Sequence, residues 1–171
     1  MSSEAPRTRG RTDLAVLGLA ALVVVLADQV SKSLVVSALA LGQRVDVVGD
    51  LVVLWRVENS GSSFSLFRFP GNQLLFYAVT IVAVGMVVWF HRAYAGRGMW
   101  LQLLLGVFLG GTLGNLIDRL RFGAVTDFIS VGFGDSRFPT WNVADASLTV
   151  SLFVLLGYIV FFDRHPTEET A

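Results

Sequence analysis

The chain has 171 residues, of which 54% are hydrophobic and 15% are charged, and its formal net charge is zero. Apolar content this high, arranged in long runs, predicts an integral membrane protein in a single domain over residues 1–171. The neutral balance gives no electrostatic support for nucleic-acid binding. The chain has no Cys, which excludes disulfides, thiol nucleophiles and Cys-ligated metal centres.

Four apolar stretches are long enough to cross about 30 Å of hydrocarbon as helices. They cover approximately Leu14–Val36, Leu74–Phe90, Met99–Ile117 and Val143–Phe162. An even number of spans places both termini on one side, and three Arg before the first span favour a cytoplasmic N-terminus. The basic start also imitates a cleavable signal peptide, but polar residues 28, 29 and 32 interrupt that pattern, which favours an uncleaved span.

Span 1 carries two ionisable residues, Asp28 and Lys32, four positions apart on one helix face. We expect an ion pair that snorkels near the outer end of the span and braces the protein rather than reacting. The following connection, Ser37–Gly71, contains a predicted hairpin in which Gly49-Asp50 separates two strand-like runs. This hairpin is expected to lie on the headgroups, to grip substrate, or both.

Span 3 places Gly106, Gly110 and Gly114 at four-residue spacing, a pattern that lets helix backbones approach closely. Asn115 and Asp118 end this seam. Two roles stay open for them: hydrogen bonding to neighbouring helices, with Arg119 as partner, or direct catalysis.

Asp127 and Asp145 are the strongest candidates for chemistry. Asn142 and Asp145 have the spacing of a capping box, so position alone explains Asp145 about as well as catalysis does. Asp127 stands in an apolar stretch where an unpartnered carboxylate is expensive. Gly132-Phe133-Gly134-Asp135 matches a Gly-x-Gly-Asp protease signature, but we interpret it as a turn because it lies in a polar connection. Two carboxylates at a bilayer are typical of an aspartyl hydrolase that acts on a membrane substrate.

Five short motifs in chain order together resemble those of bacterial lipoprotein signal peptidase, also called signal peptidase II. They are Asp28-Gln29-Val30-Ser31-Lys32, Asn59-Ser60-Gly61-Ser62-Ser63-Phe64, Gly114-Asn115-Leu116-Ile117-Asp118-Arg119, Val125-Thr126-Asp127-Phe128 and Asn142-Val143-Ala144-Asp145. The resemblance extends from span 1 to span 4. Ser62-Ser63, Trp141 and Ala146 depart from the family's common residues, and these departures leave both candidate carboxylates in place.

The resemblance implies an all-α membrane protein with four transmembrane helices and a small extracytoplasmic β-cradle-like loop between spans 1 and 2. It implies Asp127 and Asp145 as the catalytic dyad of an aspartic endopeptidase, with no metal and no cofactor. The expected substrate-binding or supporting residues are Asp28, Lys32, Asn59, Gly61, Asn115, Asp118, Arg119, Asn142 and Ala144.

The same resemblance implies the substrate and the location. The substrate would be a prolipoprotein that carries a diacylglyceryl group on its lipobox Cys, cleaved just before that Cys and surrounded by membrane lipids. Globomycin would inhibit the reaction. We expect a monomeric, multi-pass protein of the bacterial cytoplasmic (inner) membrane, with both termini cytoplasmic and the active site toward the outer face.

Three other functions fit parts of the sequence. A proton-coupled transporter or channel subunit also places carboxylates in a membrane, although the chain shows neither inverted repeats nor broken helices. A Ser–Lys protease would use Lys32, the single Lys of the chain, with one of several nearby Ser. A structural membrane subunit held by the glycine seam would leave Asp127 unexplained.

Overall fold

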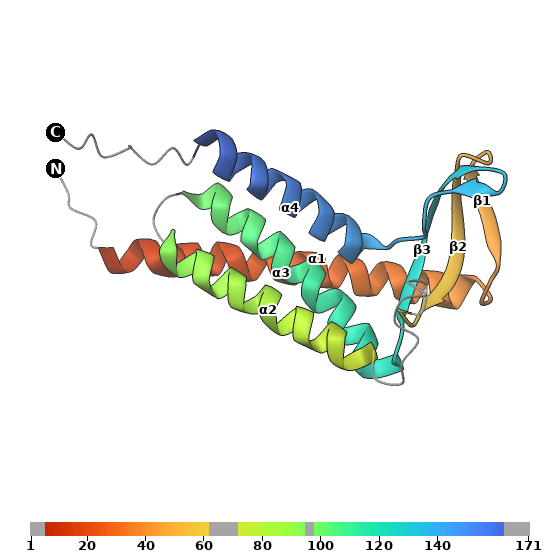
Figure 1. Ribbon diagram of the computed structural model, residues 1–171, viewed down its shortest axis with the longest axis horizontal. Coiled ribbons are helices and arrows are strands. Elements are labelled where there is room, and N and C mark those ends of the chain that lie inside the picture. Colours follow the sequence, from red (N-terminus) through yellow and green to blue (C-terminus); the bar gives the residue numbers. More distant parts are fainter. Residues whose placement is uncertain (1–5, 62–71, 95–97, 163–171) are drawn as a thin grey trace.

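The computed structural model describes residues 6–61, 72–94 and 98–162. Helices and strands follow in the order α1 (Pro6–Ala38), β1 (Arg44–Val48), β2 (Val52–Asn59), α2 (Asn72–Ala93), α3 (Met99–Phe122), β3 (Val125–Phe133), β4 (Ser136–Arg137) and α4 (Val143–Phe162). The helices form an elongated bundle, and the strands form a sheet at one end of it (Figure 1). Helix α1 begins and α4 ends at the opposite end of the bundle (Figure 1).

Three helical segments are long and apolar enough to cross a membrane: Gly10–Ala38, Gln73–Ala93 and Met99–Phe122. They match the first three predicted spans. The fourth predicted span is a helix over the expected residues, and its crossing of the membrane stays a prediction. Outward-facing side chains such as Leu19, Ile81 and Phe153 are large, apolar and more than half exposed, as expected for surfaces that face lipid.

Helix α3 packs against α1, α2 and α4 and so forms the centre of the bundle. The predicted glycine seam is confirmed at the contact between α1 and α3. A Cβ atom on Gly110 would lie 2.6 Å from the Val24 Cβ atom, and one on Gly114 would lie 2.7 Å from Asp28 Oδ2. Only glycine therefore lets α3 approach α1 this closely at these two positions, and the approach brings the polar residues of both helices together.

The strands form one antiparallel sheet in the order β1-β2-β3-β4. The predicted hairpin is confirmed as β1 and β2. The loop between the first two spans, where β structure was expected, supplies only part of the sheet, because β3 and β4 come from the connection between α3 and α4. The residues around Asp127 were interpreted as an apolar stretch, and the strand that pairs with them lies far away in sequence.

The end of α3 determines where Asp127 lies. Gly123 caps the helix with φ of 74°, a left-handed conformation that favours glycine, and its N–H donates to the Arg119 carbonyl over 3.0 Å. The chain then enters β3, where Asp127 pairs with Val57 of β2. The predicted turn is also confirmed, since β3 ends at Phe133 and β4 begins at Ser136. Asp127 is thus fixed at the junction of bundle and sheet.

Candidate active site

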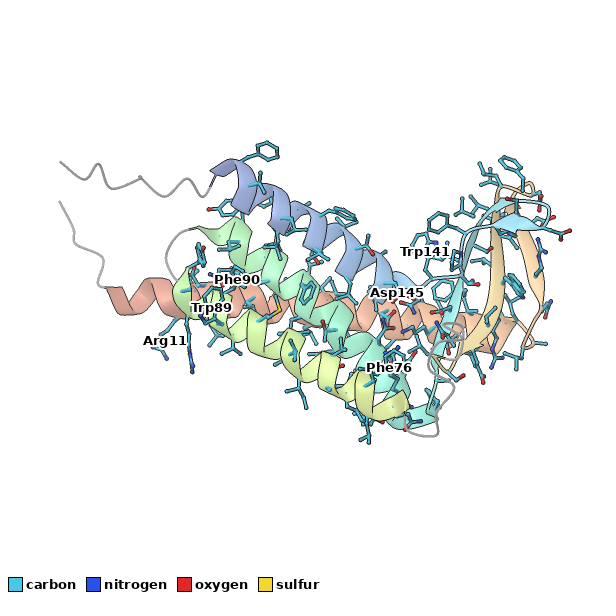
Figure 2. The ribbon with its side chains drawn as sticks, in the orientation of Figure 1. Arg11, Phe76, Trp89, Phe90, Trp141 and Asp145 are labelled. Atoms are coloured by element: carbon cyan, nitrogen blue, oxygen red, sulfur yellow. The ribbon has the colours of Figure 1, made fainter. Side chains whose placement is uncertain are left out.

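Asp127 and Asp145 come from different elements and lie near each other. Asp127 is the third residue of β3 and is only 3% exposed, whereas Asp145 lies in the first turn of α4 and is partly buried. Figure 2 shows Asp145 at the end of α4 that faces the sheet. The two side chains are close enough that the charge of Asp145 raises the pKa of Asp127.

Three asparagine amides hold the two carboxylates. Asp127 accepts hydrogen bonds from Asn59 Nδ2 over 3.0 Å and from Asn142 Nδ2 over 2.7 Å. Asp145 accepts one from Asn115 Nδ2 over 2.7 Å. An amide N–H orients a carboxylate without neutralising its charge. The geometry thus fixes both carboxylates, and neither forms an ion pair with a Lys or Arg of the described residues.

Asn142 links the pair directly. Its Oδ1 accepts the Asp145 backbone N–H over 2.9 Å, and Asp145 Oδ2 accepts the Asn142 backbone N–H over 3.3 Å. This is the capping box that the spacing predicted. Because the Nδ2 atom of the same side chain binds Asp127, one residue both starts α4 and sets Asp145 against Asp127.

The environment of Asp127 shifts its titration towards neutrality. Burial is the largest cause and raises the pKa of the Asp127 carboxyl to about 6. The hydrogen bond from Asn59 lowers the pKa of Asp127, and the charge of Asp145 raises it. The hydrogen bond from Asn142 and the charge of Lys32 have smaller effects, and both lower this pKa. Arg119 of α3 is a further charged group whose field reaches Asp127.

A second charged cluster lies beside the pair, and we call Asp28, Lys32 and Asp118 the Lys32 cluster. Lys32 Nζ lies 2.7 Å from Asp28 Oδ2 and 2.9 Å from Asp118 Oδ2. The predicted pair of Asp28 and Lys32 is confirmed. The expected snorkelling is wrong, because Lys32 is only 4% exposed and is held inward by two carboxylates.

The expected partner Arg119 hydrogen-bonds Asn115, but Asp118 forms its ion pair with another residue. The seam brings α1 against α3, so Asp118 pairs with Lys32 of α1 rather than with its neighbour Arg119. Gln29, absent from the predicted site residues, also donates to Asp118 Oδ1 over 2.8 Å. Its position next to Asp28 at membrane depth was the available signal. The expected hydrogen bonding of Asn115 and Asp118 to neighbouring elements is confirmed.

Arg119 and Gly61, at the start of the loop after β2, both lie against the Phe76 ring of α2. The Arg119 guanidinium carbon lies 4.2 Å from the centroid of the Phe76 ring, and its Nη1 donates to the Asn115 carbonyl over 3.3 Å. Gly61 has φ of +80° and donates its N–H to Asn59 Oδ1 over 2.9 Å. A side chain on Gly61 would meet the Phe76 ring. The rest of this motif, residues 62–64, lies outside the described residues.

Ala144, the remaining predicted supporting residue, is fully buried directly before Asp145. Its N–H donates to Asp28 Oδ1 over 2.9 Å. A Cβ atom on Gly114 would lie 3.3 Å from the Ala144 Cβ atom, so both positions favour small residues. Ala144 therefore supports the site through its backbone and its small size rather than through a polar side chain.

Two cavities share Asp145 as a wall. One, of about 580 Å³, lies between α4 and the segment before it and has the largely apolar lining Val131, Phe138, Pro139, Trp141, Ala146 and Val150. The other, of about 380 Å³, lies among α2, α3 and α4 and includes Phe76, Asn115 and Arg119 in its lining. Figure 2 shows Trp141 and Phe76 on either side of Asp145. Over residues 6–61, 72–94 and 98–162, no group of three or more His, Asp or Glu side chains is arranged to hold a metal ion.

The sequence is similar to those of known proteins. A family model described as signal peptidase (SPase) II matches residues 20–161. Lipoprotein signal peptidase of Shouchella clausii is 35% identical over 150 residues, which cover 88% of this chain and 96% of the relative. The relative of the same name from Bacillus velezensis is 36% identical over 151 residues, covering 88% and 97%.

Solved structures show the same fold. A bacterial membrane enzyme determined by the in meso method at 1.9 Å resolution has a TM-score of 0.76 and 29% identity, covering 84% of this chain and 92% of that chain. A second bacterial membrane enzyme, determined by the same method at 2.3 Å resolution, has a TM-score of 0.75 and 28% identity. The chain therefore belongs to the signal peptidase II family.

Proposed function

We propose that this protein removes the signal peptide from diacylglyceryl-modified prolipoproteins as an aspartic endopeptidase whose dyad is Asp127 and Asp145. One observation carries the assignment of the dyad. Two carboxylates from β3 and α4 are joined through Asn142, and one of them lines two cavities. Within the part of the chain that the structure describes, no Lys or Arg forms an ion pair with either of them.

The mechanism follows from this pair of carboxylates. Two neighbouring carboxylates share one proton and titrate as a unit. The ionised member takes a proton from a water molecule, whose oxygen attacks the scissile carbonyl carbon. The protonated member donates a hydrogen bond to the carbonyl oxygen and stabilises the tetrahedral oxyanion. The C–N bond then breaks as a proton passes to the amine that leaves.

The surroundings of Asp127 suit this role. A pKa of about 6 places its titration close to neutral pH, where a carboxyl group exchanges protons most effectively. Asn59 and Asn142 fix the orientation of the carboxylate, so little reorganisation is needed during the reaction. The dyad is thus tuned by burial and positioned by amides.

The two cavities support a substrate with a lipid and a peptide part. We assign the apolar cavity beside Trp141 to acyl chains and the cavity beside Arg119 and Asn115, which offers polar groups, to the peptide. Both open next to Asp145, so a scissile bond between these two parts of the substrate would lie at the dyad. The surrounding membrane lipids complete the apolar environment.

We further propose a monomer in the bacterial cytoplasmic membrane that crosses it four times. Because α1 begins and α4 ends at the end of the bundle opposite Asp145, the dyad would face the outer side if the termini are cytoplasmic (Figures 1 and 2). The three Arg before the first span favour that orientation. The outward apolar faces of the helices supply the lipid contacts.

Two alternatives lose support. The relatives named above are peptidases, which does not favour a transporter or channel subunit. A Ser–Lys mechanism needs a Lys directed at a Ser. The three N–H donors of Lys32 instead meet Asp28, Asp118 and Asn115.

The test compares purified wild-type protein with Asp127→Asn and Asp145→Asn on lipidated and unlipidated prolipoprotein. We expect wild-type protein to cleave the lipidated substrate only and to be inhibited by globomycin. Each variant should lose at least about 1,000-fold in rate, because an amide cannot exchange the proton. Full activity in either variant, or cleavage that ignores both lipidation and globomycin, contradicts the proposal.

A further inference from the structure

The residue before each dyad carboxylate is held by a carboxylate of the Lys32 cluster. Ala144 precedes Asp145, and its N–H donates to Asp28 Oδ1 over 2.9 Å. Thr126 precedes Asp127, and its N–H donates to Asp118 Oδ2 over 3.2 Å. Asp28 belongs to α1 and Asp118 to α3. Two buried carboxylates on different helices therefore accept hydrogen bonds from the two backbone segments that carry Asp127 and Asp145.

Lys32 joins these two buried carboxylates. Its Nζ lies 2.7 Å from Asp28 Oδ2, 2.9 Å from Asp118 Oδ2 and 3.2 Å from Asn115 Oδ1. An ammonium group has three N–H donors, so these three acceptors use all of them. Asn115 in turn donates to Asp145 Oδ1 over 2.7 Å. Lys32 thus reaches the dyad by three routes: through Ala144, through Thr126 and through Asn115.

We propose that Lys32 is a positioning residue that sets the separation and mutual orientation of Asp127 and Asp145 by holding Asp28 and Asp118 together. Lys32 lines neither cavity. Without its charge, Asp28 and Asp118 are neighbouring buried carboxylates that repel each other. Their separation would draw Ala144 away from Thr126 and widen the gap between the dyad carboxylates. Misplacement by about 1 Å costs on the order of 100-fold in rate.

A compact charge is required at this position. An ammonium is a small point charge, whereas a guanidinium is a planar fork that needs more room and a different arrangement of acceptors. The space is already tight, because a Cβ atom on Gly114 would lie 2.7 Å from Asp28 Oδ2. Arginine would therefore keep the charge but change the spacing that the cluster sets.

The test measures kcat, KM and the pH dependence of kcat/KM on lipidated prolipoprotein for Lys32→Met and Lys32→Arg. We expect Lys32→Met to lower kcat at least about 100-fold with KM changed less than about threefold. The acid limb of its kcat/KM profile should move to higher pH, because the charge of Lys32 lowers the pKa of Asp127. A role confined to fold stability would lower the amount of folded protein and leave the kcat of the folded fraction at the wild-type value. Arg92→Gln, an exposed change in the last turn of α2, serves as the matched loss of a cation and should behave as wild type.

Lys32→Arg tests the geometry if Lys32→Met does not fold. We expect its kcat to fall at least about tenfold while the acid limb stays within about 0.3 pH units of wild type. Wild-type kcat in a folded Lys32 variant, or a loss confined to KM with an unmoved acid limb in Lys32→Met, overturns the proposal.

This inference rests on the proposed function, and Asp127→Asn separates the two. An active Asp127→Asn overturns the dyad itself. An inactive Asp127→Asn beside a fully active Lys32→Met overturns the positioning role alone.

Discussion

Two pairs of carboxylates lie side by side at the end of the bundle, and they differ in what surrounds them. Asp28 and Asp118 share the ammonium of Lys32, and both are at most 2% exposed. Asp127 and Asp145 are held by asparagine amides, and Asp145 opens onto two cavities. The first pair has a cation in contact and lines neither cavity, whereas the second pair includes a cavity-lining member and forms no ion pair with a Lys or Arg of the described residues.

On the function that we propose, this difference separates structural carboxylates from reactive ones. A buried carboxylate with a cationic partner stays charged and resists removal of that partner. A carboxylate that only accepts hydrogen bonds beside a like charge must share a proton with its neighbour. Burial alone therefore does not identify a catalytic group in this protein, because all four carboxylates lie close together. The local counter-charge and the access to a cavity distinguish them.

Among changes that keep Asp127, Asp145 and Lys32 in place, the largest effect should come from giving the dyad a counter-charge. In Asn59→Lys, an ammonium replaces the amide that lies 3.0 Å from Asp127 Oδ2. We expect the rate of prolipoprotein cleavage to fall at least about 100-fold, because the cation holds the pair ionised and leaves no carboxylic acid. Asn59→Met removes the same hydrogen bond without adding charge and should lose less than about tenfold. Equal rates in the two variants would refute this contrast.

The next prediction concerns stability against pH. The folded-state pKa of Asp127 is raised from 3.8 to about 6, so the folded protein binds more protons than the unfolded chain between these pH values. The ionised carboxylate thus destabilises the fold above about pH 6, by at most about 3 kcal/mol, and this effect disappears below about pH 4.

Asp127→Asn removes this titration. Its melting temperature minus that of wild type should be larger at pH 8 than at pH 4.5, measured in the same detergent. The amide also places an N–H group against one of the two amide donors, which adds a penalty that does not depend on pH. A difference that stays constant with pH would show that Asp127 has no raised pKa.

A smaller loss should follow from crowding the Lys32 cluster. Gly114→Ala places a Cβ atom 2.7 Å from Asp28 Oδ2, and overpacking of this kind destabilises by about 1–3 kcal/mol. Thermal unfolding measures the effect. Gly85→Ala on α2 is the matched control, because a Cβ atom there meets nothing within 4 Å. If both variants melt at the same temperature, the close approach of α1 and α3 does not matter for stability.

The smallest effect should come from a compensated pair in water. Arg44 and Asp50 lie 3.6 Å apart with side chains 40% and 45% exposed. Arg44→Gln should change stability by less than about 0.5 kcal/mol, since exposed ion pairs contribute little. Cleavage should stay at the wild-type rate. A loss of several degrees in melting temperature would mean that an exposed ion pair contributes substantially to the stability of the sheet.

Local patterns in the sequence predicted the parts of the protein that depend on local interactions. The first three spans follow from apolar length, the hairpin from its turn, and the capping box of Asn142 and Asp145 from a three-residue spacing. The glycine seam was also visible because it repeats every four residues. Each of these features depends on residues that are close together in the sequence.

Long-range pairing could not be predicted in the same way. Strand β3 was missed because its partner β2 lies before α2, and no local pattern reports that register. Arg119, the neighbour of Asp118 in sequence, was expected as partner, whereas helix packing brings Lys32 of α1 to Asp118. Lys32 was expected at the membrane surface for a related reason: snorkelling follows from one helix alone, and burial depends on the facing helix.

The most direct test of this account compares Asp145→Asn with Asp118→Asn, with single-turnover cleavage rate and melting temperature measured on the same samples. Asp145→Asn should slow cleavage at least about 1,000-fold and shift the melting temperature by less than about 3 °C. Asp118→Asn should lower the melting temperature by about 10 °C, because it breaks a buried ion pair. A folded Asp145→Asn that cleaves within about tenfold of the wild-type rate would contradict the central claim that Asp127 and Asp145 carry out the reaction.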